Sequence, residues 1–197
     1  MYDNEKWKKY NELTKNSPPR QMVVKAVELF GDFVGNAIDI GSGAGNDSIY
    51  LINYNWNVLA VDKSSNGFDN IKNNLSNEQK IKFSSKQITF EELDVLPKCD
   101  LINSSFSIPF CQPAYFNKFL DVIKNSISVN GRFAGNFFGK NDGWSKSDQM
   151  SFCSIEDVRN IFSDFEVEFI EEKEYDGKTA AGNDKHWNII NLVARKK

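Results

Sequence analysis

Apolar residues recur at helical spacing early in the chain and then give way to short continuous runs. Between Arg20 and Phe30 the apolar side chains fall three and four positions apart, which predicts an amphipathic helix ending at Gly31. Beyond it, short apolar runs are bounded by polar or glycine-rich segments, as expected of buried strands. The pattern therefore changes from helical to strand-like at this point.

The rest of the chain predicts seven strands that mostly alternate with helices. The expected strands are residues 37–40, 57–61, 80–84, 100–103, 132–138, 166–174 and 187–194. The expected helices are residues 3–16, 20–30, 46–54, 65–77, 115–127 and 154–162, with a loop or short helix at 87–93. This alternation favours an α/β fold with a mostly parallel sheet and helices on both faces. The last two strands have no helix between them, so we expect them to pair as an antiparallel hairpin.

Length and composition favour a single domain over residues 1–197. The chain is long enough to bury a substantial core, and its 40% hydrophobic and 26% charged contents are ordinary for a globular protein. Residues 1–19 are polar, but Trp7 and Tyr10 give them one apolar edge. We expect a short helix there, which either packs on the core of residues 20–197 or closes over its ligand as a lid.

Charge and residue usage argue against several classes of function. The net charge of -3, the pI near 5.3 and the mixing of lysines with acids leave no basic stripe for nucleic acid. No apolar run approaches the roughly 18 residues of a membrane span, and the first residues lack the apolar core of a signal peptide. Three widely spaced cysteines are typical of a reduced cytoplasmic protein, and a single histidine disfavours zinc.

The segment after the first expected strand combines three glycines with a carboxylate. Gly41, Gly43 and Gly45 let a ligand approach the backbone, and the next helix offers unpaired N–H groups. A dinucleotide fingerprint, GxGxxG, would require its third glycine at position 46, where the chain has Asn46. Asp39 stands at the mouth of this loop, where a carboxylate is unfavourable beside a pyrophosphate but suits an ammonium group.

A second acid stands at the end of the next expected strand. Asp62, about 20 residues beyond the first loop, can accept two hydrogen bonds from a ribose diol. A ligand with an amino acid at one end and a nucleoside at the other fits both Asp39 and Asp62. S-adenosylmethionine is that ligand, and the sequence predicts it as the cofactor.

Four segments resemble class I S-adenosylmethionine-dependent methyltransferases. DIGSGAG is similar to their first motif and VLAVDKS to their second. CDLINSSFSIPF resembles their fourth strand and the segment after it, and SVNGRFAGNFFG resembles their fifth strand with its Asn-Gly turn. The resemblance spans about residues 20–197 and implies a Rossmann-like seven-stranded sheet with an antiparallel last strand. Among subfamilies, the chain is similar to tellurite-resistance-type and thiopurine-type small-molecule methyltransferases.

The resemblance also implies which residues hold the cofactor. The glycine loop would line the methionine part, with Asp39 at its amino group, and Asp62 would hold the ribose. Lys63 departs from the family, which often has an apolar side chain there, but its stem can cover the adenine ring. The implied cofactor-binding set is Tyr10, Asp39, Gly41, Ser42, Gly43, Gly45, Asp62, Lys63, Thr89, Phe90, Glu91, Asn103, Ser104 and Ser105.

Aromatic residues are expected to enclose the methyl acceptor. They are Trp7, Phe106, Phe110, Trp144 and Trp187. Trp187 also fits a core position. Such walls favour a small, partly apolar acceptor, although no residue identifies it. His186 is the only side chain with a near-neutral intrinsic pKa, and His186 and Asp142 are the candidate general bases.

The expected function is in-line methyl transfer from S-adenosylmethionine to a small molecule. A thiol or thiolate acceptor would need little acid–base help, so the protein would mainly align the reactants and exclude water. Two alternatives stay open. One is a protein that binds S-adenosylmethionine without transferring its methyl group. The other is a nucleotide-dependent oxidoreductase, against which Asn46 and Asp39 argue. We expect a monomer or homodimer with no nucleic-acid or membrane partner.

Overall fold

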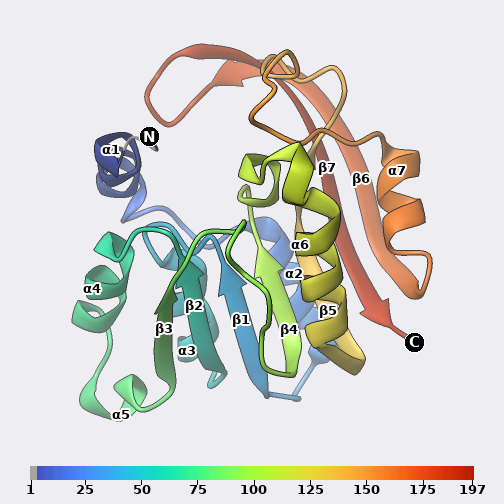
Figure 1. Cartoon of the computed structure of the whole chain (residues 1–197). Coiled ribbons are helices and arrows are strands. Elements are labelled where there is room, and N and C mark those ends of the chain that lie inside the picture. Colours follow the sequence, from blue (N-terminus) through green and yellow to red (C-terminus); the bar gives the residue numbers. More distant parts are fainter. Residues whose placement is uncertain (1–3) are drawn as a thin grey trace.

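A computed structural model describes residues 4–197 and contains one seven-stranded sheet (Figure 1). Its strands lie in the order β3-β2-β1-β4-β5-β7-β6. They are β1 (Asn36–Ile40), β2 (Asn57–Asp62), β3 (Phe83–Gln87), β4 (Cys99–Ser104), β5 (Ile127–Phe138), β6 (Phe165–Lys178) and β7 (Asp184–Lys196). Neighbouring strands pair in parallel, except that β7 is antiparallel to both β5 and β6. The predicted mostly parallel α/β sheet with an antiparallel last strand is confirmed.

Helices cover both faces of this sheet, as predicted (Figure 1). The helical elements are α1 (Asn4–Thr14), α2 (Gln21–Phe30), α3 (Asn46–Asn53), α4 (Asn66–Asn73), α5 (Asn77–Lys80), η1 (Ile108–Phe110), α6 (Pro113–Ser126) and α7 (Ile155–Ile161). Buried side chains of α2, α3 and α4 form one core with the sheet, and those of α6 and α7 form the other. The expected helix at 3–16 forms as α1, and its residue 3 lies outside the described residues.

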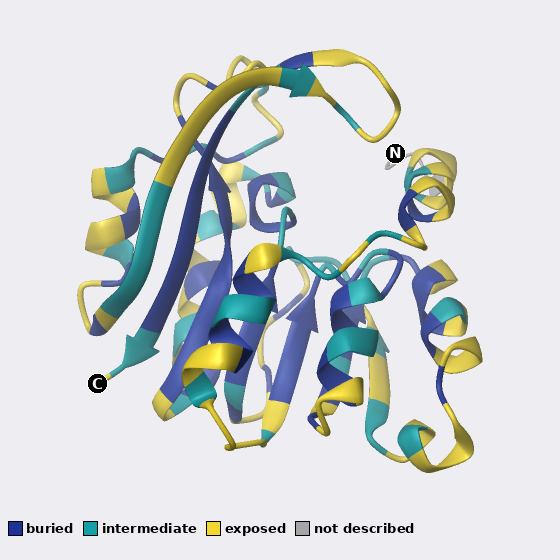
Figure 2. Ribbon diagram, turned by 180° about the vertical axis from the view of Figure 1, so that it is seen from behind, coloured by how far each residue is buried: buried dark blue, intermediate teal, exposed yellow. Residues whose placement is uncertain are grey.

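Alternation along the central strands divides their side chains between the two cores. Ile38 and Ile40 of β1 pack with α6 and α7, whereas Ala37 packs with α2 and α3. Both faces of a mostly parallel sheet are therefore buried, which explains why the central strands read as continuous apolar runs (Figure 2). The chain leaves β1 toward β2 on one side and returns to β4 on the other. Ligands of such sheets bind where the strand order reverses in this way.

The final hairpin is longer than its apolar pattern predicts. The sequence indicates strands at 166–174 and 187–194, but β6 and β7 stay paired as far as Lys178 and Asp184. Beyond the sheet, main-chain hydrogen bonds support it, including Gly143 N to His186 O at 2.8 Å. The added residues are polar, so no apolar alternation marks them as strand. The hairpin arches over the carboxyl ends of the central strands toward α1 (Figure 1).

Strand β3 begins three residues later than predicted, because a short helix precedes it. Ser76 caps α5 by accepting a hydrogen bond from Gln79 N, and the Gln79 side chain accepts one from Ser76 N. This reciprocal capping box forms a helical turn that ends at Lys80, the first residue of the expected strand. The pairing of Val58 with Phe83 then fixes the register of β3 beside β2.

Candidate functional site

A cavity of about 850 Å³ opens at the carboxyl ends of the central strands. Its floor comes from the loops after β1, β2 and β4. Its sides come from α1, from Trp144 and from the tip of the β6–β7 hairpin, including Lys178 and Asn183. In Figure 2 the hairpin arches above this edge of the sheet toward α1. The volume is within the range of small-molecule sites in proteins.

The glycine loop after β1 is shaped by left-handed backbone conformations. Gly41 has a φ of 69°, and a Cβ placed there would lie 2.3 Å from Ser107 Cβ. Gly45 has a φ of 90°, and a Cβ there would lie 2.1 Å from Ile71 Cγ1 in α4. Both positions therefore require glycine, but for different reasons. Gly41 brings the loop close to the segment after β4, whereas Gly45 lets α3 start against α4.

Two buried carboxylates meet behind the glycine loop. Asp39 ends β1, and Asp47 lies in the first turn of α3. Asn103 Nδ2 donates to Asp39 Oδ1 at 2.8 Å and to Asp47 Oδ2 at 2.9 Å. Ser48 Oγ donates to Asp39 Oδ2 at 2.6 Å, and Arg20 N donates to Asp47 Oδ1 at 2.7 Å. Both acids line the cavity.

Burial sets the electrostatics of this pair. Burial and, after it, the neighbouring Asp47 raise the pKa of Asp39 to about 7, while the hydrogen bonds from Ser48 and Asn103 oppose the shift. Burial also raises the pKa of Asp47, against the hydrogen bond from Arg20 N. Within residues 4–197 no lysine or arginine is ion-paired with either carboxylate. The pair thus concentrates negative charge beside the cavity, where a ligand ammonium would neutralise it.

Asp62 stands on the other side of the glycine loop. Its Oδ2 accepts a hydrogen bond from Gly43 N at 2.9 Å, and its Oδ1 accepts one from Ser64 N at 2.8 Å. Burial raises the pKa of Asp62, and these two N–H groups oppose that shift. The hydroxyl of Ser42, between the two acids in the loop, is buried and has no hydrogen-bond partner within residues 4–197. A buried hydroxyl in a cavity wall is a ready hydrogen-bonding group for a ligand.

Most of the expected cofactor-binding residues line the cavity. These are Tyr10, Asp39, Gly41, Ser42, Gly43, Asp62, Lys63, Thr89, Phe90, Glu91 and Ser105. The structure does not bring the other three to its surface. Gly45 faces Ile71, and Asn103 is buried beneath Asp39 and Asp47. Ser104 is buried as well, with its Oγ 2.6 Å from Ser107 Oγ. These three residues lie beneath the cavity wall and support the residues that line it.

All five aromatic residues expected around the acceptor line the cavity, together with two that the sequence does not predict. The expected residues are Trp7, Phe106, Phe110, Trp144 and Trp187, and the additional ones are Phe138 and Tyr175. Their rings meet edge-on, as with Trp7 and Phe110, whose centroids are 4.9 Å apart at 89°. Phe106 has a φ of 54°, an unusual conformation for a bulky residue, and Asn136 Oδ1 accepts a hydrogen bond from its N–H at 3.2 Å.

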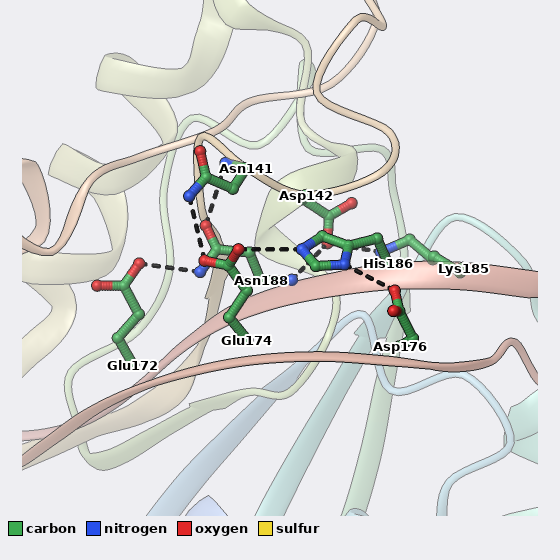
Figure 3. A network of polar contacts seen from close by, with 8 residues as sticks. All are labelled: Asn141, Asp142, Glu172, Glu174, Asp176, Lys185, His186 and Asn188. Atoms are coloured by element: carbon green, nitrogen blue, oxygen red, sulfur yellow. Dashed lines mark hydrogen bonds and ion pairs between the residues drawn. The ribbon is translucent and has the colours of Figure 1, made fainter.

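His186 does not reach this cavity. Its Nδ1 lies 2.8 Å from Asp176 Oδ1 and its Nε2 lies 3.1 Å from Glu174 Oε1, both on the neighbouring strand (Figure 3). Side chains alternate along a strand, so His186 must point away from the face on which Trp187 lines the cavity. Hydrogen bonds that the His186 ring donates to Asp176 and then to Glu174 raise the pKa of His186. His186, expected to act as a base on the acceptor, therefore lies on the outer face of the hairpin and not beside the acceptor site.

Asp142 is also placed differently from the sequence expectation. The carboxylate is buried, and its Oδ2 accepts a hydrogen bond from Lys185 Nζ at 2.6 Å (Figure 3). It also accepts from Trp144 N at 3.0 Å and from Asn188 N at 3.2 Å. With these partners and no surface on the cavity, Asp142 is not placed to take a proton from a bound acceptor. The expectation that Asp142 acts as a general base is therefore corrected as well.

The sequence gives no indication that several other residues line the cavity. Asp47 reads as an ordinary acid in the first turn of a helix, which the helix dipole favours. Arg20 reads as the residue before a helix, yet its guanidinium lies 4.9 Å from the centroid of Phe106 and 3.4 Å from Tyr10 Oη. The hairpin tip reads as a polar loop. Only the register of β6 and β7 brings its residues to the cavity.

Metal and membrane features are absent from the part of the chain that the structure describes. Over residues 4–197 no group of three or more histidine, cysteine or acidic side chains is arranged to hold a metal ion. No helix in this range is long and apolar enough to cross a bilayer. The three cysteines are free and buried, and burial raises the pKa of each thiol.

Solved structures of methyltransferases have a similar fold. TehB from Haemophilus influenzae has a TM-score of 0.74 and 17% identity, over 89% of this chain and 61% of that one. The 1,6-didemethyltoxoflavin-N1-methyltransferase from Burkholderia thailandensis, solved with 1,6-didemethyltoxoflavin and S-adenosylhomocysteine, has a TM-score of 0.69 and 17% identity, over 90% and 77%. The N-methyltransferase NodS from Bradyrhizobium japonicum WM9, solved with S-adenosylhomocysteine, has a TM-score of 0.70 and 11% identity, over 98% and 97%.

Sequence comparison identifies the family. No curated protein matches the chain. The chain spans less than two thirds of the length of the Haemophilus TehB structure, so likeness to that protein extends to the shared fold. The family model described as tellurite resistance protein TehB, however, matches residues 2–185, which is most of the chain. The glycine loop and the buried acids lie inside this range. The chain therefore belongs to the TehB family.

Proposed function

We propose that this protein transfers a methyl group from S-adenosylmethionine to a small-molecule acceptor. The observation that carries the proposal is the pair of acids on one cavity, with Asp39 and Asp62 on the two sides of the glycine loop. Membership of the TehB family supports it. So do structural neighbours that are methyltransferases holding S-adenosylhomocysteine, a product of that reaction.

The residues of the cavity suit each part of this cofactor. Asp39 and Asp47 present buried negative charge for the ammonium of the methionine part, and the unpartnered Ser42 hydroxyl can bond its carboxylate. Asp62 offers carboxylate oxygens to the ribose diol if its hydrogen bond with Gly43 N rearranges. The part of the cavity next to Asp62 is bordered by residues 89–91 and the stem of Lys63, and adenine would lie there.

The protein's own contribution would be alignment and exclusion of water. When bound, S-adenosylmethionine supplies a methyl group already activated by its sulfonium. The aromatic walls would hold the acceptor in line with that methyl group and keep solvent out.

No general base is assigned among the predicted residues. His186 lies on the outer face of the hairpin, and Asp142 is buried in an ion pair. The acceptor that fits this arrangement is a nucleophile such as a thiolate, which attacks without giving up a proton to the protein. A protein that binds S-adenosylmethionine without catalysis has the same cofactor site, so only product formation separates the two.

Calorimetric titration with S-adenosylmethionine tests the cofactor assignment. Asp62→Asn keeps the shape of the side chain and removes its charge, and we expect it to weaken binding by roughly ten-fold or more, as loss of a charged hydrogen-bonding partner does. Asp69→Asn removes an exposed acid of α4 and is the matched control, with wild-type affinity expected. Absence of binding to the wild-type protein would overturn the proposal. Titration with NADH would then test the oxidoreductase alternative.

A further inference from the structure

Lys185 carries a buried ammonium group at the start of β7. Its side chain is 1% exposed, and its Nζ lies 2.6 Å from Asp142 Oδ2, a carboxylate that is itself fully buried. The contact is visible beneath the loop that follows β5 (Figure 3). A buried ion pair needs further favourable contacts to offset its loss of water.

Three aromatic rings provide those contacts. Lys185 Nζ lies 3.5 Å from the ring centroid of Trp187, 4.2 Å from that of Trp144 and 4.6 Å from that of Phe138. The three rings also pack on one another, with centroids 5.7 to 6.0 Å apart. An acid plus several ring faces is the arrangement with which proteins hold ligand ammonium groups. Here the protein fills the arrangement with its own side chain.

We propose that Phe138, Trp144, Trp187 and Asp142 form a cation cage occupied by Lys185, which positions the aromatic wall of the acceptor site and makes that site select uncharged or anionic acceptors over cationic ones. The selectivity rests on the proposed function, because it assumes that the aromatic end of the cavity receives the acceptor. The existence of the occupied cage does not rest on the proposed function.

The positioning follows from the elements that the cage joins. Asp142 and Trp144 belong to the loop after β5, whereas Lys185 and Trp187 belong to β7. Asp142 accepts hydrogen bonds from Lys185 Nζ, Trp144 N and Asn188 N, so one carboxylate fastens the loop to the strand. Phe138, Trp144 and Trp187 also line the cavity, so fastening them fixes that wall.

The charge selectivity follows from what the rings already contact. The cage interior, the natural place for a cationic acceptor, holds the Lys185 ammonium. Two other rings of the cavity are also next to protein cations. The Arg20 guanidinium is 4.9 Å from the Phe106 centroid, and Lys63 Nζ is 4.6 Å from the Trp7 centroid. A cationic acceptor would meet repulsion at these rings, whereas a flat uncharged or anionic molecule would pack against them.

Chemical rescue tests the cage. Lys185→Ala removes the three methylenes and ammonium that propylammonium would replace, so we expect this variant to melt lower than wild type and to regain several degrees with propylammonium but not with 1-propanol. Lys178→Ala, which breaks an exposed ion pair on the same hairpin, is the control and should show no rescue. Equal effects of the two additives on Lys185→Ala would overturn the cage.

A second pair of variants covers the case in which Lys185→Ala does not fold. Lys185→Met keeps the stem but leaves Asp142 buried without its partner, so the cage predicts that adding Asp142→Asn raises the melting temperature of Lys185→Met. The tryptophan emission of Lys185→Met should also change, because the ammonium leaves the faces of Trp144 and Trp187. A double variant that melts below Lys185→Met, with unchanged emission, would contradict the cage.

Matched probes test the selectivity. Quinoline and N-methylquinolinium share a flat skeleton and differ in charge, and both are titrated into protein saturated with S-adenosylhomocysteine. We expect wild type to bind quinoline at least about ten-fold tighter, and Lys185→Met to narrow this ratio with S-adenosylhomocysteine affinity unchanged. Equal binding, preference for the cation or no binding of either probe would overturn the selectivity. Failure of S-adenosylhomocysteine itself to bind would instead count against the proposed function, and propylammonium rescue would still stand.

Discussion

Asp39 and Asp47 are joined by a single amide nitrogen, Nδ2 of Asn103, which donates to both buried carboxylates. Among residues 4–197 neither acid is ion-paired with a lysine or arginine, and the two lie side by side at the point where the strand order reverses. Such an arrangement is unfavourable in the free protein and favourable once a positive group arrives. Asn103 is buried, and its Oδ1 accepts a hydrogen bond from Ser105 Oγ at 2.9 Å, so its amide is held in place to position the two acids.

The raised pKa of Asp39 predicts that the free protein loses stability as the pH rises. Because the folded protein holds this proton to about pH 7 and the unfolded chain releases it near 3.8, the stabilising contribution is complete below 3.8 and is lost as the pH rises through 7. We expect the melting temperature without ligand to fall between pH 5 and 8, as measured by calorimetry. Asp39→Asn should flatten this part of the curve.

The raised pKa of Asp39 also predicts how ligand affinity depends on pH. The ammonium of S-adenosylmethionine needs the ionised pair, so its affinity should increase as the pH rises through 7. Asp39→Asn should remove this increase, and the exposed Asp69→Asn should retain it. An affinity that is the same at pH 6 and pH 8 would show that the ammonium does not bind at Asp39.

The sequence was sufficient for the sheet and the glycine loop because local signals determine both. The strands read as apolar runs, and Asp39, Gly41 and Asp62 are conspicuous beside them. Asp47 was missed because it suits a helix N-terminus without any ligand. Its meeting with Asp39 depends on how α3 packs on β1, which no local pattern encodes.

The hairpin shows where reading from sequence fails for the site. The face to which His186 points follows from the register of β7, and one residue of slip would reverse it. Polar pairing between Lys178 and Asp184 extends the strands without an apolar pattern. The partnership of Asp142 with Lys185 joins residues 43 apart in the chain. Such contacts cannot be inferred from composition or residue spacing.

Gly45 should tolerate substitution less well than another glycine with a similar φ angle. Gly182 has a φ of 86°, close to the 90° of Gly45, but a Cβ there meets nothing within 4 Å. Both alanine variants carry the left-handed strain of roughly 1–2 kcal/mol. Gly45→Ala adds a clash with Ile71, which overpacking studies put at about 1–3 kcal/mol. Urea unfolding measures the difference.

The clash also predicts a coupling between positions 45 and 71. Ile71→Ala removes the atoms that a Cβ at position 45 would meet, so Gly45→Ala should cost less in that background. Equal costs of Gly45→Ala in both backgrounds would show that backbone strain alone requires the glycine.

His186 should contribute to stability in a pH-dependent way and not to catalysis. Its pKa is raised by Asp176 and Glu174, so its contribution is present below the unfolded value near 6.5 and is lost as the pH rises through the folded value. His186→Gln should therefore lower the melting temperature more at pH 6 than at pH 9. Affinity for S-adenosylmethionine should not change. A large loss of methyl transfer in this variant would return His186 to the list of candidate bases.

Trp7 is the residue through which α1 should act as a lid. Its ring meets Phe110 edge-on at 4.9 Å, and Lys63 Nζ lies 4.6 Å from its centroid. Contacts of these two kinds contribute about 1–2 kcal/mol together, which corresponds to roughly ten-fold in a rate constant. Trp7→Ala should therefore speed release of S-adenosylmethionine about ten-fold in stopped-flow measurements, with association little changed. Lys8→Ala, on the exposed side of the same helix, should leave both rates alone. Release that is equally fast in wild type and Trp7→Ala would mean that α1 packs beside the cavity without closing it.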